Sequence, residues 1–96
     1  MTEADIRDNP DANRYELPIG DQMAVVTYNL SDPNLMITET LVPQALEGQG
    51  IASRLARHVI ADARARGLLI LPVCPFFSAY FQKHPDDADV VHPTYR

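Results

Sequence analysis

One amphipathic segment constrains this sequence more than any other feature. Its apolar residues recur three and four positions apart, which places them on one face of an α-helix: Ala52, Leu55, Ala56, Val59, Ile60 and Ala63. Gly67 is placed to end the helix in the left-handed conformation, and Arg64 and Arg66 lie near the negative end of the helix dipole. The spacing therefore predicts one long helix that ends at Arg66.

Three runs of β-forming residues precede this helix, at residues 14–19, 23–30 and 35–42. The turn residues between them, Gly20-Asp21 and Ser31 to Asn34, form connections short enough for hairpins. We therefore expect the three runs to pair as an antiparallel meander.

The segment after the helix predicts a change of strand direction. Residues 68–73 are nearly all apolar, which is typical of a buried strand reached by a right-handed crossover. Pro72 cannot donate to a ladder, so neighbouring strands should separate there. Residues 76–83 predict a second helix, and residues 89–91 a short final strand. The expected fold class is α/β with a mixed (α+β) sheet, a meander followed by α-β-α.

Length and composition limit the possible functions. The chain has 96 residues, enough for one domain, and we expect a flexible tail at residues 1–13 ahead of a single domain at residues 14–96. Eight basic residues stand against thirteen acidic ones, with a net charge of -5, which argues against a nucleic-acid partner.

The sequence also argues against a membrane or metal protein. No run approaches the ~20 apolar residues of a membrane span. Cys74 is the only cysteine and suits a reducing compartment, so we expect a cytoplasmic protein. His58 and His92 lack metal-ligand spacing with any partner, so no metal is expected.

A glycine-containing turn, Glu47-Gly48-Gln49-Gly50-Ile51-Ala52, lies directly before the long helix. Glycines allow close approach to a ligand, and a helix N-terminus offers unpaired N–H groups and a partial positive charge. The turn is therefore either a phosphate site or a plain connection. It lacks the Gly-Lys-Ser/Thr ending of a nucleotide P-loop and the third glycine of a dinucleotide fingerprint.

The turn resembles the pyrophosphate motif of the GNAT acyltransferase superfamily, Gln/Arg-x-x-Gly-x-Gly/Ala, read onto Glu47, Gly50 and Ala52. Over residues 14–92 the chain also resembles the small YjdJ-like branch, through the phrases Thr40-Leu41-Val42-Pro43, Val73-Cys74-Pro75-Phe76 and Tyr80 followed by Lys83-His84-Pro85. It departs in two places: Glu47 replaces the motif's Gln or Arg, and Glu39-Thr40-Leu41-Val42-Pro43 replaces the usual His-Thr-Glu-Val-Pro.

The resemblance implies two parallel strands that splay apart, with the pantetheine arm of acetyl-coenzyme A between them. Main-chain groups near Leu41 and Val42 would pair with the pantetheine amides. The turn residues would hold the pyrophosphate, from Glu47 through Gly48, Gln49, Gly50 and Ile51 to Ala52. Arg54, about one turn further, would reach the coenzyme, and Lys83 would either touch its phosphates or adenine or form a solvated helix end.

Three residues are candidates for catalysis. Glu39 would deprotonate the acceptor ammonium, or is an exposed strand carboxylate. Cys74 would lie near the coenzyme sulfur as nucleophile or acid, or is a small buried side chain. Tyr80 resembles the tyrosine that protonates the leaving thiolate in the superfamily, or packs with Phe77 and Phe81.

The expected function is acetyl-CoA-dependent N-acetylation of an amine in a protein, a peptide or a small molecule such as a polyamine. A non-catalytic acyl-CoA-binding module is the alternative, because the usual His and Glu are replaced by Glu39 and Leu41. A structural domain whose turn merely connects two elements is the third hypothesis. The sequence leaves the acceptor and the oligomeric state open.

Overall fold

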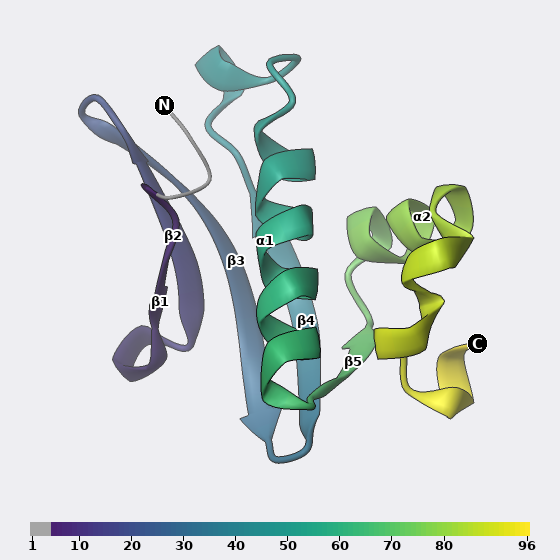
Figure 1. Cartoon of the computed structure of the whole chain (residues 1–96). Coiled ribbons are helices and arrows are strands. Elements are labelled where there is room, and N and C mark those ends of the chain that lie inside the picture. Colours follow the sequence, from purple (N-terminus) through teal and green to yellow (C-terminus); the bar gives the residue numbers. More distant parts are fainter. Residues whose placement is uncertain (1–4) are drawn as a thin grey trace.

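The computed structural model describes residues 5–96. A five-stranded sheet in the order β1-β2-β3-β4-β5 carries two α-helices, and α1 crosses in front of the sheet in Figure 1. The elements are β1 (Arg7–Asn9), β2 (Arg14–Ile19), β3 (Gln22–Ser31), β4 (Asn34–Leu41), α1 (Ile51–Arg66), β5 (Leu69–Pro72) and α2 (Pro75–Lys83). Short 3-10 turns lie at Pro10–Ala12, Gln44–Leu46, Pro85–Val90 and Pro93–Tyr95.

The strand pairing confirms the predicted mixed sheet. β2, β3 and β4 pair antiparallel as a meander, whereas β5 lies parallel to β4 after the α1 crossover. The side-chain spacing of α1 is also as predicted, since its buried residues are Ile51, Leu55, Ala56, Val59, Ile60 and Ala63. Gly67 ends this helix at φ 68°, and its N–H faces the carbonyls of Ala63 and Arg64.

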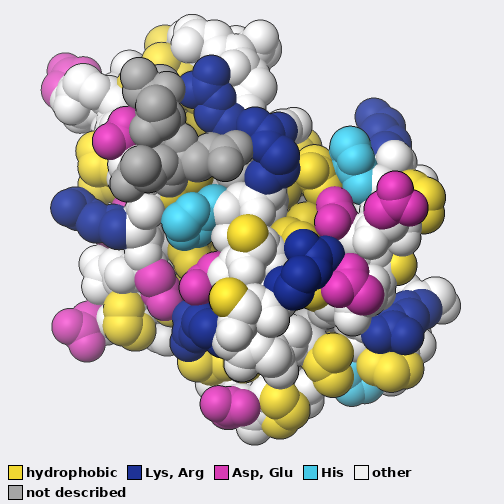
Figure 2. Space-filling model, in the orientation of Figure 1, with side chains coloured by type: hydrophobic (Ala, Val, Ile, Leu, Met, Phe, Trp, Pro, Cys, Tyr) yellow, Lys and Arg dark blue, Asp and Glu magenta, His cyan; other side chains and the backbone are white. Residues whose placement is uncertain are grey.

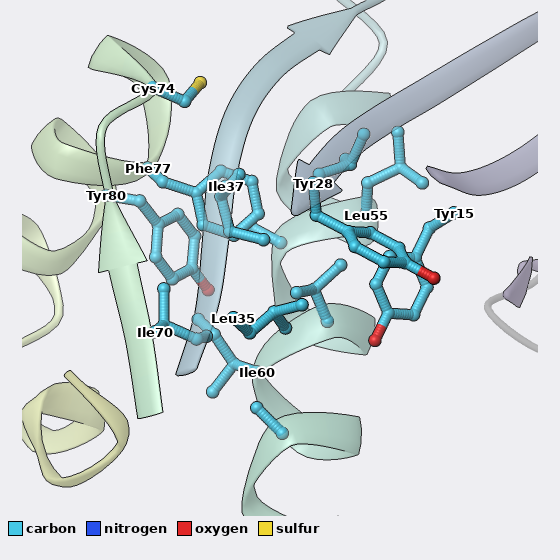
Figure 3. Close-up of a cluster of buried hydrophobic side chains, with 14 of the residues drawn as sticks. Tyr15, Tyr28, Leu35, Ile37, Leu55, Ile60, Ile70, Cys74, Phe77 and Tyr80 are labelled. Atoms are coloured by element: carbon cyan, nitrogen blue, oxygen red, sulfur yellow. The ribbon is translucent and has the colours of Figure 1, made fainter. Parts of the chain in front are cut away.

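The hydrophobic core fills the space between one face of the sheet and the two helices. Figure 3 shows side chains of β4, β5, α1 and α2 meeting there, with Cys74 at the edge of the cluster. Val26 and Tyr28 of β3 are buried on this face, so Thr27 between them points to the other face. Glu39 pairs with Thr27 across the ladder and therefore also points away from the helices.

The prediction of a flexible tail at residues 1–13 is wrong for residues 6–13, which are part of the fold. Residues Arg7–Asn9 form β1, antiparallel to β2, and Ile6 is only 5% exposed. Polar contacts hold this strand, because the Glu16 carboxylate accepts hydrogen bonds from Arg7 (3.3 Å), Asn9 (3.0 Å) and Arg14 (2.7 Å). Residues 1–4 of the predicted tail lie outside the described residues.

The strand predicted at residues 89–91 is also wrong. Residues Pro85–Val90 form a 3-10 helix, and only Val91 makes a single parallel bridge, to Ile70. Arg64 of α1 holds the end of this segment through Asp89, with a Nη2–Oδ1 distance of 2.7 Å. An ion pair with α1 therefore holds this segment, and not the repeated hydrogen bonds of a strand ladder.

The buried Glu16 cluster gives the fold a pH-dependent contribution. Hydrogen bonds from Arg14 and Asn9 hold the pKa of the Glu16 carboxyl below its usual range. A folded pKa below the unfolded value of about 4.3 means that this carboxylate stabilises the fold fully above that pH. The contribution is lost as the pH falls through the folded pKa.

We therefore expect Glu16→Gln to lower the melting temperature at pH 7, with the difference from the native chain shrinking as the pH falls below about 4. Thermal melts between pH 7 and pH 3 measure this difference. Glu39→Gln is the matched control, since Glu39 is exposed on the same sheet face. A Glu16→Gln deficit that is equal at every pH would contradict the argument.

Candidate functional site

The turn before α1 adopts the backbone that its glycines allow. Gly48 has φ 84° and Gly50 has φ 75°, a region that costs other L-residues about 1 kcal/mol or more. Gly50 is the N-cap of α1, and no side chain of residues 5–96 caps the helix there. The carbonyl of Gly50 accepts the first helical bond, from the N–H of Arg54. The N–H groups of the first turn therefore have no helical partner and can receive an anion.

A cleft of about 550 Å³ opens beside these N–H groups, between the end of β4 and the start of α1. It is lined by Thr40, Leu41, Val42, Leu46, Glu47, Gly48, Gly50, Ile51, Ala52, Ser53 and Phe76. Most of the residues predicted to hold a coenzyme thus lie together, whereas Gln49, Arg54 and Lys83 are not among those that line the cleft.

Sequence reasoning missed part of this lining. Ser53 directly follows the glycine turn, and Phe76 belongs to the Cys-Pro-Phe phrase, but neither position by itself predicts a ligand contact. Thr40 stands between two residues that were considered, Glu39 and Leu41. Side chains alternate along a strand, so Thr40 and Glu39 must point to opposite faces. This alternation could have predicted that Thr40 faces the cleft when Glu39 does not.

β4 and β5 separate at the cleft, as Pro72 predicted. Their parallel register ends at the pair Ile37 and Pro72. One further link follows, from the N–H of Cys74 to the carbonyl of Ile37 at 2.9 Å. Among the described residues, β4 continues to Leu41 paired with β3 alone. The β3–β4 register shifts between Thr27 and Tyr28, next to the point where β4 leaves β5. The free edge of β4 therefore runs along the cleft.

Cys74 lies where the two strands part. It is 3% exposed, and its Sγ is 3.3 Å from the Oγ1 of Thr40, which lines the cleft. Cys74 also serves as the N-cap residue of α2. The Cys74 thiol thus contacts the hydroxyl of a residue that lines the cleft, although Cys74 itself is not among the lining residues.

The other two catalytic candidates lie elsewhere. Glu39 is exposed on the sheet face that points away from the helices. Tyr80 is 7% exposed on α2, and its ring stacks on His84 with centroids 4.1 Å apart and planes at 25°. The structure therefore does not bring Glu39, Cys74 and Tyr80 to one point.

Tyr80 faces a second cleft, of about 560 Å³, between α1 and α2. This cleft is lined by Ser53, Arg57, Ile60, Arg64, Tyr80, His84 and Asp87, so Ser53 borders both clefts. Asp89 and Asp87 bind Arg64 and raise the pKa of its guanidinium. Figure 2 shows basic side chains over the part of this face where α1 begins.

Residues 5–96 contain no group of three or more His, Cys, Asp or Glu side chains arranged to hold a metal ion. Within the same range, no helix has the length and apolar character needed to cross a bilayer.

Comparisons with known proteins bear on the family and the fold. A family model described as GCN5-related N-acetyl-transferase matches residues 14–90. No curated protein matches the sequence. Among solved structures, the chain is similar to an NMR structure from Staphylococcus aureus, of a protein provisionally named a GCN5-like N-acetyltransferase. The TM-score is 0.73 at 26% identity, over 96% of this chain and 91% of the other. These matches concern the family, and the YjdJ-like branch stays a prediction.

Proposed function

Because the chain belongs to the GCN5-related N-acetyltransferase family, we propose that it transfers an acetyl group from acetyl-coenzyme A to an amine. One observation carries the proposal. The start of α1, with Gly48 and Gly50 at positive φ, opens onto a cleft lined by Thr40 and Leu41, which belong to the part of β4 beyond its last pair with β5. A helix N-terminus with unpaired N–H groups and a free strand edge thus border one cavity.

In this proposal each end of the cleft has a separate task. The N–H groups of residues 48–53 hold the pyrophosphate, where the helix dipole favours negative charge. The free edge of β4 near Leu41 and Val42 offers main-chain groups to the pantetheine amides. Glu47 is exposed, so its carboxylate can turn to solvent while its main chain stays in the loop.

The thioester supplies an activated acetyl carbon, which a neutral amine attacks while the coenzyme thiolate leaves and takes a proton. We assign the proton donor to Cys74, because it lies beside Thr40 at the parting of the strands. Tyr80 is the alternative donor and would act from the second cleft. Glu39 would receive the ammonium proton from the opposite sheet face, directly or through water.

The separation of these groups favours one competing function. Glu39 lies on the face opposite Cys74 and Thr40, and Leu41, 50% exposed, stands where the resembled branch has a glutamate. A site that binds an acyl-CoA without turnover would need the cleft but no base. This non-catalytic module is therefore the second candidate.

Two measurements distinguish these functions. Acetyl-coenzyme A at 100 times its dissociation constant should stabilise the fold by about 2.7 kcal/mol and raise the melting temperature by about 10 °C or more. Release of free coenzyme thiol should then require an added amine, tested with a polyamine and a lysine peptide. Stabilisation without thiol release would indicate the binding module, and no stabilisation would rule out both.

A further inference from the structure

The sheet face that points away from the helices, behind α1 in Figure 1, has an apolar area next to Glu39. Leu41 pairs with Val25 and lies on this face, because it follows Glu39 by two residues. Met23 precedes Val25 by two residues and lies there as well. Leu41 is 50% exposed and Met23 36%, and we call Met23, Val25 and Leu41 the outer patch. Leu41 also lines the first cleft, so the outer patch adjoins the proposed donor site.

Glu39 is the carboxylate that this face offers to a ligand. It is exposed, and within residues 5–96 it forms no ion pair. Glu16, on the same face, is 3% exposed and is already bound by Arg7 and Arg14. Across the strands from Glu39 the next charged side chain is Arg14, about 10 Å away, because Thr27 pairs with both. A ligand at Glu39 therefore meets one unpaired negative charge, with net positive charge beyond it.

We infer that the acetyl acceptor is a small amine that carries one positive charge on an apolar chain. The inference rests on the proposed function and names its substrate class. Glu39 binds the ammonium, and the chain lies over Leu41, which is two residues along β4 and about 7 Å away. In the transfer the ammonium gives one proton to Glu39, and its nitrogen bonds the acetyl carbon as the carbon–sulfur bond breaks. The second proton that the nitrogen loses balances the one that the thiolate takes up.

The two other kinds of amine fit this face less well. A polyamine bound at Glu39 would place its second ammonium over the outer patch or towards Arg14, and neither offers it a negative charge. A lysine peptide would bring main-chain N–H and C=O groups that need hydrogen-bond partners. Apolar side chains supply none, and the free edge of β4 is assigned to the donor. A small apolar amine has one polar group, which Glu39 satisfies.

Thiol release from saturating acetyl-coenzyme A, measured on the native chain with a series of amines, tests this inference. From propylamine to hexylamine, kcat/KM should rise about twofold for each added methylene and about tenfold in all, because these amines differ only in apolar length. Spermidine and a lysine peptide should be at least about tenfold poorer than hexylamine. No dependence on length, or a preference for spermidine or the peptide, would overturn the inference while the proposed function stands. No thiol release with any amine would remove both.

One variant should change the preferred acceptor. Leu41→Glu puts a second carboxylate about 7 Å from Glu39, so it should shift the preference from hexylamine towards the diamine cadaverine by about tenfold. The preference is a ratio of two kcat/KM values, so any change in donor binding cancels. Leu30→Glu is the matched control: Leu30 is 41% exposed and pairs with Leu35 near the other end of β3, and its variant should keep the native preference. The inference fails if the two variants change the preference equally, or if neither changes it.

Discussion

Gly50→Trp should abolish measurable binding of acetyl-coenzyme A, with a loss of affinity of at least about 100-fold. Gly50 lines the cleft, and the space above its Cα is open, so an indole there would occupy the volume proposed for the pyrophosphate. The backbone at φ 75° also penalises any side chain, which should lower stability by about 1–2 kcal/mol. Calorimetric titration measures the affinity, and thermal melts confirm that the variant is folded.

The chain offers a matched control for the strain. Gly20 has φ 61° in the turn between β2 and β3, its Cα also faces open space, and it lines neither of the two clefts described above. Gly20→Trp should therefore lose similar stability and keep native affinity. If Gly50→Trp also binds with native affinity, the phosphate site is not at the start of α1, and the proposed function loses its main support.

The sequence predicted those parts of the fold that local patterns specify. The apolar spacing of α1 and its end at Gly67 depend on neighbours within one or two helical turns, and both are confirmed. β1 has no such pattern, because residues 7–9 are polar. Contacts with distant residues hold it instead: Glu16 accepts from its side chains, and Asp8 accepts a hydrogen bond from Tyr28 at 2.5 Å. Such contacts have no signature in a short window of sequence.

The same distinction applies to the candidate site. The glycine turn could be predicted, because residues 47–52 are contiguous and their special backbone requires glycine at two positions. The second cleft could not, since it exists only where Ser53 and Arg57 of α1 meet Tyr80 and His84 of α2. The sequence therefore predicts Tyr80 as the donor to the thiolate or as a packing partner of Phe77 and Phe81, while its position beside His84 depends on how the two helices pack.

Cys74→Ala should lower kcat for acetyl transfer by about 100-fold and leave the dissociation constant of acetyl-coenzyme A unchanged. The thiol lies 3.3 Å from the Thr40 hydroxyl where β4 and β5 part, and in the proposed mechanism it protonates the leaving thiolate and does not bind the phosphates. Loss of one small buried group should cost the fold only about 1 kcal/mol. Steady-state kinetics with a saturating amine, together with calorimetry, separate turnover from binding.

Two further variants decide which group donates the proton. Cys74→Ser keeps an O–H donor beside Thr40 and should retain more turnover than Cys74→Ala, whereas a purely packing role for Cys74 would leave kcat near its native value in both. Tyr80→Phe removes only the hydroxyl of a residue that lines the second cleft and not the first, so it should reduce kcat much less than Cys74→Ala. The reverse order would transfer the role to Tyr80. Native turnover in both Cys74→Ala and Tyr80→Phe would mean that solvent protonates the thiolate. The cleft would then bind the acetyl donor without supplying the proton.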